Sequence, residues 1–133
     1  MQRLLMIAGA AVLAVTAQAH AEGDAAAGEK VFRKCQACHA VGEDAKNKVG
    51  PQLNGVVGRA WGAVEGYKYS NALIEMGEAE SKVWDNETLD AYLTKPRDVI
   101  PKGKMAFAGL RKEEDRANVI AYLAQYGPDG ATQ

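Results

Sequence analysis

Four segments of this chain place apolar residues three or four positions apart, which is the spacing that gives an α-helix one apolar face. They span residues 23–35, 70–81, 84–96 and 112–128. In the first segment Gly28, Phe32 and Cys35 fall on one face, and Asp24 can cap the N-terminus. Strand-like alternation is absent, so the pattern predicts an all-α protein.

The last two predicted helices have the clearest limits. Asp85 can cap the third, which ends at Pro96, and the acids at 113–115 suit the positive end of the last helix's dipole. Their apolar faces consist of Leu89, Tyr92 and Leu93 in the third helix and Val119, Tyr122, Leu123 and Tyr126 in the last.

Residues 42–66 lack periodicity, are rich in glycine and include Pro51, so we expect loops and turns there. Loops of this length usually have a function or wrap around another group. Few helices with long loops leave a thin core, which indicates that a bound apolar group completes it.

The N-terminus is typical of a cleavable secretory signal peptide. It has a basic Arg3, an apolar run over residues 4–15 and small-residue cleavage sites after Ala19 and after Ala21, of which the second gives the boundaries used below. The apolar run is shorter than the roughly 20 residues that span a bilayer. We therefore expect export of the chain to the periplasm, removal of residues 1–21, a single domain over 22–133 and no stable membrane insertion.

Charge is nearly balanced overall, with a formal net charge of −1, but it is unevenly distributed along the chain. Residues 95–112 contain six basic side chains and one acid, Asp98. Residues 65–90 contain seven acids and two lysines. These blocks predict a molecule with oppositely charged sides, and we expect no nucleic-acid partner.

The strongest chemical signal is Cys-x-x-Cys-His at Cys35, Cys38 and His39, the attachment pattern of a c-type haem. On one helical turn these positions are i, i+3 and i+4, so the three side chains point to one side. The two sulfurs can then bond to the haem vinyl groups while the imidazole reaches the iron.

Two other kinds of site use these residue types. A structural zinc ion needs four ligands, and beyond the signal segment the chain has no further cysteine or histidine. A redox dithiol is expected near a βαβ pattern, which this sequence lacks. Both alternatives are less favoured than haem attachment.

If His39 is one axial ligand, Met76 and Met105 are the only methionines beyond the signal segment that can supply a soft ligand on the other side of the iron. Met76 lies in a predicted helix and fits a packing role. Met105 lies with Phe107 in a Gly- and Pro-containing loop, which favours a segment folded over the haem with Met105 as sixth ligand. Six-coordinate iron then leaves one-electron transfer as its chemistry.

From Gly23 to Tyr126 the chain resembles a class I c-type cytochrome, the kind known in bacteria as cytochrome c2 and similar to the mitochondrial protein. The resemblance rests on "KCQACHAV", "VGPQLNGVVGR", "GYKYSNA", "WDNETLDAYLTKP", "IPKGKMAFAGL" and "VIAYLAQY", in the family's order. It implies a small cytochrome c fold, with three to five helices and long loops around one covalently bound haem c.

The resemblance also implies how the haem is held. The carbonyl of Pro51 would accept a hydrogen bond from His39, and Arg59, Tyr69 and Trp84 would hold a buried haem propionate.

Other haem-lining roles follow from the same resemblance. Tyr92 would lie near the ligating Met105, and Phe107 beside the exposed haem edge. Gly103 stands where many relatives have a Thr or Ser that bonds a propionate, and a four-residue insertion falls within residues 73–83, so we transfer no haem contact there.

The function implied is that of a monomeric periplasmic carrier of single electrons, and not of an enzyme. It would take electrons from a cytochrome bc1-type complex and pass them to a photosynthetic reaction centre, a terminal oxidase or another reductase. Lysines at positions 34, 48, 102 and 104 would ring the haem edge and dock transiently on acidic partners. The alternative is a haem enzyme or a sensor of peroxide or gas with a labile Met105.

Overall fold

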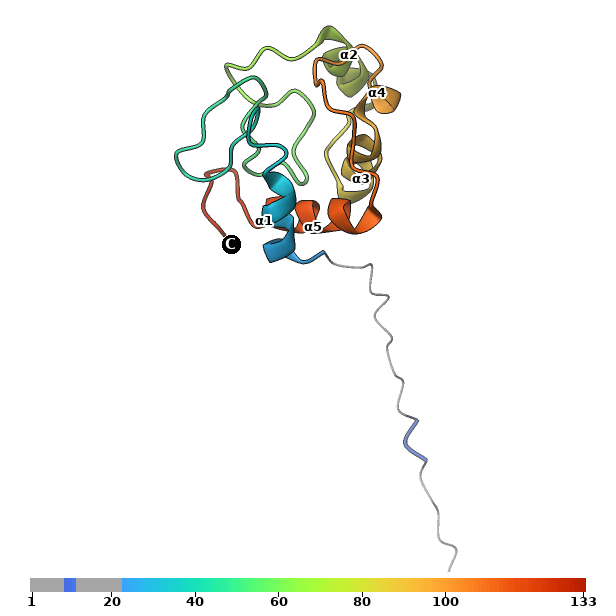
Figure 1. Cartoon of the computed structure of the whole chain (residues 1–133). Coiled ribbons are helices and arrows are strands. Elements are labelled where there is room, and N and C mark those ends of the chain that lie inside the picture. Colours follow the sequence, from blue (N-terminus) through green and yellow to red (C-terminus); the bar gives the residue numbers. More distant parts are fainter. Residues whose placement is uncertain (1–8, 12–22) are drawn as a thin grey trace, which may run out of the picture.

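A computed structural model describes residues 9–11 and 23–133 of the protein, so nearly all of the predicted signal peptide lies outside the described residues (Figure 1). The helices are α1 (Ala25–Phe32), α2 (Asn71–Glu80), α3 (Asn86–Thr94), α4 (Pro96–Val99) and α5 (Glu113–Ala124). In the described ranges the only β-type pairings are isolated bridges, Ala60 with Val83 and Tyr126 with Thr132. The all-α prediction is confirmed.

Helices α1 and α5 cross at the base of the molecule in the orientation of Figure 1. The crossing is close because Gly28 has no side chain: a Cβ there would lie 1.9 Å from the carbonyl oxygen of Asn118. The side chain of Asn118 also accepts a hydrogen bond of 2.8 Å from the backbone N–H of Asp24. Phe32 packs on Tyr122 with 5.3 Å between ring centres.

The prediction that the first helix runs to Cys35 is wrong at its C-terminus. Asp24 caps α1 as predicted, accepting hydrogen bonds from two backbone N–H groups of the first turn. After Phe32, however, the N–H of Lys34 bonds to Val31 and that of Cys35 to Phe32, three residues back rather than four. The tighter turns end α1 and begin the Cys-x-x-Cys-His segment.

Pro96 ends α3 as predicted and also begins α4, which the sequence pattern did not predict. Lys95 adopts an extended conformation, with φ −161° and ψ 96°, and separates the two helices. Proline suits the first position of a helix because the N–H that it lacks would have no partner there. Beyond α4, residues 100–112 form an irregular segment, here called the strap, which carries Met105 and leads into α5.

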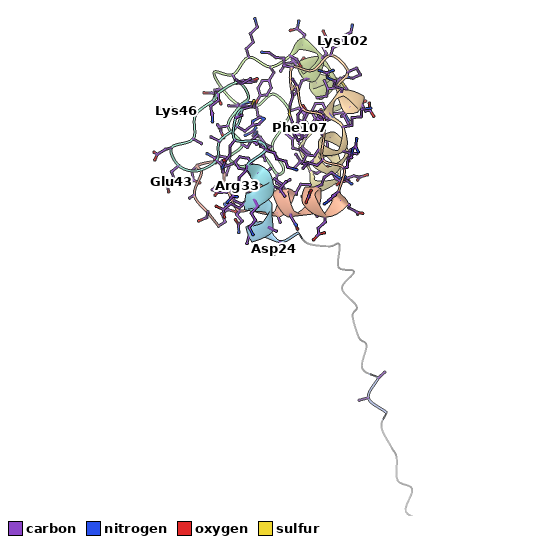
Figure 2. The ribbon with its side chains drawn as sticks, in the orientation of Figure 1. Asp24, Arg33, Glu43, Lys46, Lys102 and Phe107 are labelled. Atoms are coloured by element: carbon purple, nitrogen blue, oxygen red, sulfur yellow. The ribbon has the colours of Figure 1, made fainter. Side chains whose placement is uncertain are left out.

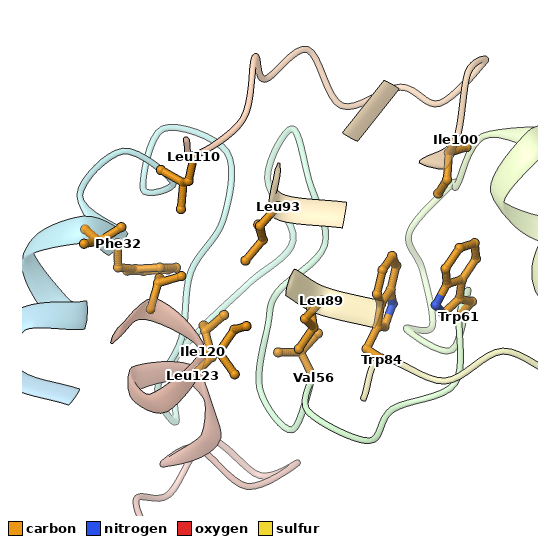
Figure 3. Close-up of a cluster of buried hydrophobic side chains, with 12 residues drawn as sticks. Phe32, Val56, Trp61, Trp84, Leu89, Leu93, Ile100, Leu110, Ile120 and Leu123 are labelled. Atoms are coloured by element: carbon orange, nitrogen blue, oxygen red, sulfur yellow. The ribbon is translucent and has the colours of Figure 1, made fainter. Parts of the chain in front are cut away.

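One cluster of buried apolar side chains joins these elements (Figure 3). Leu89 and Leu93 of α3 meet Ile120 and Leu123 of α5 at its centre. At one end of the cluster the rings of Trp61 and Trp84 stack, with centroids 4.4 Å apart, next to Ile100 of the strap. Met76 packs at the edge of this core, as predicted.

Candidate haem site

The Cys-x-x-Cys-His segment forms one helical turn directly after α1. The N–H groups of Cys38 and His39 both bond to the carbonyl oxygen of Cys35, at 3.1 and 2.9 Å. Both cysteines are free thiols and half-buried. Burial is the main cause of a raised pKa for the Cys35 thiol, with Cys38 adding to it and Lys34 opposing it.

His39 is held in a fixed orientation by the segment that follows. Its Nδ1 lies 2.7 Å from the carbonyl oxygen of Pro51, the hydrogen bond that the resemblance implies. The ring lies against the backbone of Gly50, where a Cβ would come within 2.4 Å of Cε1. Burial lowers the pKa of His39, which favours the neutral imidazole that a metal requires. With Nδ1 donating to Pro51, Nε2 is the nitrogen that remains for an iron ion.

The strap places Met105 against α3. The hydroxyl of Tyr92 donates a hydrogen bond of 3.5 Å to Met105 Sδ, so the predicted neighbourhood of these two residues is present. Burial, with a smaller effect of Tyr67, raises the pKa of Tyr92 to about 12, which keeps its hydroxyl protonated. Phe107 is half-buried and packs on the main core. Figure 2 shows it near the centre of the view, with Lys102 at the outline of the molecule.

The three residues predicted to hold a propionate lie in the loop after the Cys-x-x-Cys-His turn and at the start of α3. Arg59 Nη1 donates to the carbonyl oxygens of Gln52 and Asn54, at 3.0 Å each. Burial lowers the pKa of the guanidinium, and Tyr69 is close enough to oppose that shift. Trp84 is buried, and its ring lies 4.9 Å from that of Tyr92.

Trp61 is a residue of this region that the sequence analysis missed. It is buried and stacked on Trp84, and its indole nitrogen has no hydrogen-bond partner within the described chain. The same is true of Arg59 Nε, two residues earlier. In the sequence, Trp61 appears only as a single tryptophan within "GRAWG", with no motif around it. Such a residue is ordinarily part of the core, so the sequence offers no reason to assign it to the site.

These unpaired donors test whether the residues fit a haem. A buried donor without a partner costs about 1–3 kcal/mol, so two of them, on residues two positions apart in the chain, indicate that an acceptor is missing. A haem supplies acidic propionates, two carbons for the thiols and an iron for neutral imidazole and thioether ligands. The donor set formed by Cys35, Cys38, His39 and Met105 with Arg59 therefore fits a haem.

A protein-only metal site is not formed in the described part of the chain. No three His, Cys, Asp or Glu side chains within residues 9–11 and 23–133 are arranged to hold a metal ion.

Among the helices of these ranges, none has the length and apolar character needed to cross a membrane.

Basic side chains lie next to the segments that contain His39 and Met105. Lys48 Nζ donates a hydrogen bond of 2.6 Å to the carbonyl oxygen of Gln36, between the two cysteines. Lys104 Nζ donates a hydrogen bond of 2.6 Å to the backbone carbonyl oxygen of Lys68 and lies 5.5 Å from the ring centre of Tyr67. Val49, next to Lys48, is 74% exposed, so an apolar side chain accompanies the charges at this surface.

Comparison with known proteins gives consistent results. The family model "Cytochrome c" matches residues 25–126. The chain is 49% identical over 128 residues to cytochrome c-554 of Methylosinus trichosporium, covering 96% of this chain and 94% of that protein. It is 53% identical over 102 residues to cytochrome c2 of Agrobacterium tumefaciens (strain II Chrys), covering 77% and 91%.

Solved structures show the same similarity. Cytochrome c2 from Rhodospirillum centenum superposes with a TM-score of 0.73 at 42% identity, covering 80% of this chain and all of that one. Cytochrome cH from Methylobacterium extorquens gives 0.69 at 43% identity, covering 77% and 98%.

Proposed function

This chain belongs to the cytochrome c family, and on that premise we propose that it carries single electrons in the periplasm through one haem c with His39 and Met105 as axial ligands. Membership of the family implies the covalent haem and electron-carrier chemistry. The attachment through Cys35 and Cys38, the two iron ligands and the compartment are our proposals.

The observation that carries this proposal is the setting of His39. Its Nδ1 donates a hydrogen bond to the carbonyl oxygen of Pro51, and Gly50, without a side chain, lets the ring lie directly against the backbone. This hydrogen bond selects the tautomer with a free Nε2 and increases the basicity of the ring as a ligand. The free thiols of the same helical turn would bind the haem covalently on the side that His39 faces.

Met105 would complete the ligand set from the strap. Tyr92 orients its sulfur through the hydroxyl and, as a half-buried and protonated group, adds no charge next to it. When bound, haem iron with one histidine and one thioether ligand supplies reversible one-electron chemistry at a raised reduction potential.

The remaining predicted residues would enclose the haem. Arg59 brings a half-buried guanidinium whose buried Nε needs an acceptor, and Tyr69 and Trp84 add a hydroxyl and an indole N–H. These groups would keep a propionate ionised away from water. Phe107 would cover the haem next to Met105. We assign the protein no catalytic residue.

We also propose the partners and location that follow from this role. A signal peptide over residues 1–21 would direct the chain to the periplasm. A cytochrome bc1-type complex would donate the electron, and a reaction centre, terminal oxidase or other reductase would accept it. Exposed lysines at positions 34, 48, 102 and 104 would guide transient docking of the monomer.

Optical spectra of the holoprotein test the ligand assignment. We expect the weak near-infrared charge-transfer band of a ferric iron–thioether bond in the wild type and its loss in Met105→Ala. Met76→Ala is the matched control, because Met76 packs at the core edge, and it should retain the band.

Carbon monoxide provides a second reading of the same assignment. The reduced wild type should not bind it at neutral pH, because Met105 would occupy the sixth position. Binding without the near-infrared band would instead support the alternative of a haem enzyme or a peroxide or gas sensor with an open sixth position.

A further inference from the structure

Arg116 of α5 is a buried arginine that none of the roles above uses. Its side chain is 11% exposed and lies between α5, α3 and the strap. Nε donates a hydrogen bond of 2.7 Å to Asp90 Oδ1 on α3. Nη1 donates to the carbonyl oxygens of Leu110 and Arg111 in the strap, at 2.8 and 3.0 Å.

These bonds hold the C-terminal end of a segment that has few other attachments. Within the described chain, the backbone groups of residues 104–109 make no hydrogen bond. On one side of this stretch, the N–H of Gly103 bonds to Ile100, which is 1% exposed. On the other side, Leu110 is 3% exposed and its N–H donates to Leu93 of α3 at 2.7 Å.

Met105 therefore sits on a span whose backbone is fixed at both ends, and between them, in the described chain, side-chain contacts alone hold it: Lys104 to Lys68, Met105 to Tyr92 and Phe107 to the core. At the C-terminal end, Leu110 is bonded through both of its backbone groups, the N–H to Leu93 and the carbonyl to Arg116. The carboxylate of Asp90 orients the planar guanidinium so that Nη1 points at the strap. Leu110 follows Met105 by five residues, so the anchoring of this end limits the conformations open to the short span that carries Met105.

We infer that Arg116, oriented by Asp90, is a positioning residue for Met105: by clamping Leu110 and Arg111 it controls how readily the Met105 thioether leaves the haem iron. The inference rests on the proposed function, because it takes Met105 as the sixth ligand. It differs from a purely structural role because it predicts faster opening of the strap without loss of the α1–α5 crossing.

The test measures how fast cyanide binds to the ferric holoprotein. Cyanide would take the sixth position of the iron only after the Met105 sulfur has left it, so its binding rate reports how readily that sulfur leaves. Arg116→Lys keeps the positive charge but lacks the planar guanidinium that bonds Asp90 and the strap together. We expect this variant to bind cyanide about ten times faster or more, as loss of charge-assisted hydrogen bonds predicts. Asp90→Asn, which keeps Arg116 in place, should give a smaller acceleration.

Arg111→Gln is the matched control. It removes a cation at the same end of the strap, but its side chain is exposed and the clamp uses only its backbone carbonyl. This variant should bind cyanide at the wild-type rate. Asp90→Asn also keeps the test decisive if Arg116→Lys does not fold.

Hydrogen exchange supplies a readout that a general loss of stability would not reproduce. In Arg116→Lys the amide of Leu110 should exchange at least several times faster, while those of Val119 and Ile120 in α5 stay as in the wild type. Equal acceleration at all of these amides would mean that Arg116 is only structural, and would overturn the inference.

The cyanide result separates two kinds of failure. Suppose that the wild type shows the iron–thioether band but Arg116→Lys and Asp90→Asn bind cyanide at the wild-type rate. The inference about Arg116 is then wrong and the proposed function stands. If the wild type lacks the band, the assignment of Met105 fails first, and the inference falls with it.

Discussion

Gly50 shows how the absence of one side chain can fix the position of a histidine ring. The imidazole of His39 lies where a Cβ on Gly50 would be, and its Nδ1 bonds to the next residue, Pro51. The pair "GP" therefore supplies both a contact surface and an acceptor. Orientation of the ring depends on this backbone as much as on the histidine itself.

Gly50→Ala should displace the His39 ring, because a Cβ would come within 2.4 Å of Cε1 and within 2.9 Å of both ring nitrogens. We expect a weakened hydrogen bond to Pro51, a shifted reduction potential and a loss of stability of about 1–3 kcal/mol. Spectroelectrochemistry and guanidinium unfolding of the holoprotein measure these effects.

Val49→Ala is the control for this prediction, since the neighbouring Val49 is 74% exposed and its change should leave potential and stability nearly unaltered. A wild-type potential in Gly50→Ala would show that the ring does not depend on this contact.

Within the described chain, α2 has the weakest packing against other helices, so its stability depends strongly on its two ends. It meets the core through Gly77, which lies against Trp61, and through the partly buried side chains of Ala72, Leu73 and Met76. Ser70 caps its N-terminus, with Oγ accepting a hydrogen bond of 3.1 Å from Leu73. Ser81 ends it in the left-handed conformation, at φ 48° and ψ 48°.

Ser81→Gly should stabilise the protein by about 1 kcal/mol, because glycine adopts a left-handed C-cap without the steric cost that a Cβ brings. The same substitution at the other end of α2, Ser70→Gly, should be slightly destabilising through loss of the cap bond. Chemical unfolding of both variants measures the contrast. A destabilised Ser81→Gly would contradict the argument.

Across the whole molecule, charge matters more for encounter than for folding. Formal net charge is close to zero, yet lysines accompany the segments of His39 and Met105, where Lys48 donates to the carbonyl oxygen of Gln36 and Lys104 to that of Lys68. An exposed Val49 adds an apolar contact among them. Such a surface suits brief docking on acidic membrane complexes, with rates that salt reduces.

We expect the rate of reaction with membrane fragments that contain a terminal oxidase to fall as ionic strength rises. Lys102→Gln should lower the low-salt rate about two- to fivefold, as loss of one steering charge predicts. Lys30→Gln, which removes an exposed lysine from α1, is the charge-matched control and should leave it nearly unchanged. Stopped-flow measurements over a salt series decide between these outcomes.

Several features of this protein follow from its sequence by itself. Asp24, Ser70 and Asp85 begin the helices predicted from the apolar spacing, and Pro96 ends α3. Cys-x-x-Cys-His indicates haem attachment without any fold. These signals are readable because capping, helical periodicity and attachment spacing involve residues within a few positions of each other.

Only the tertiary structure decided which distant groups meet. The contact of Arg116 with Asp90 joins positions 26 residues apart, and the stacking of Trp61 on Trp84 depends on how two loops return to the core. The unpaired donors of Arg59 and Trp61 likewise appear only once the chain is folded. Local spacing cannot specify such contacts, because they depend on how whole elements pack against each other.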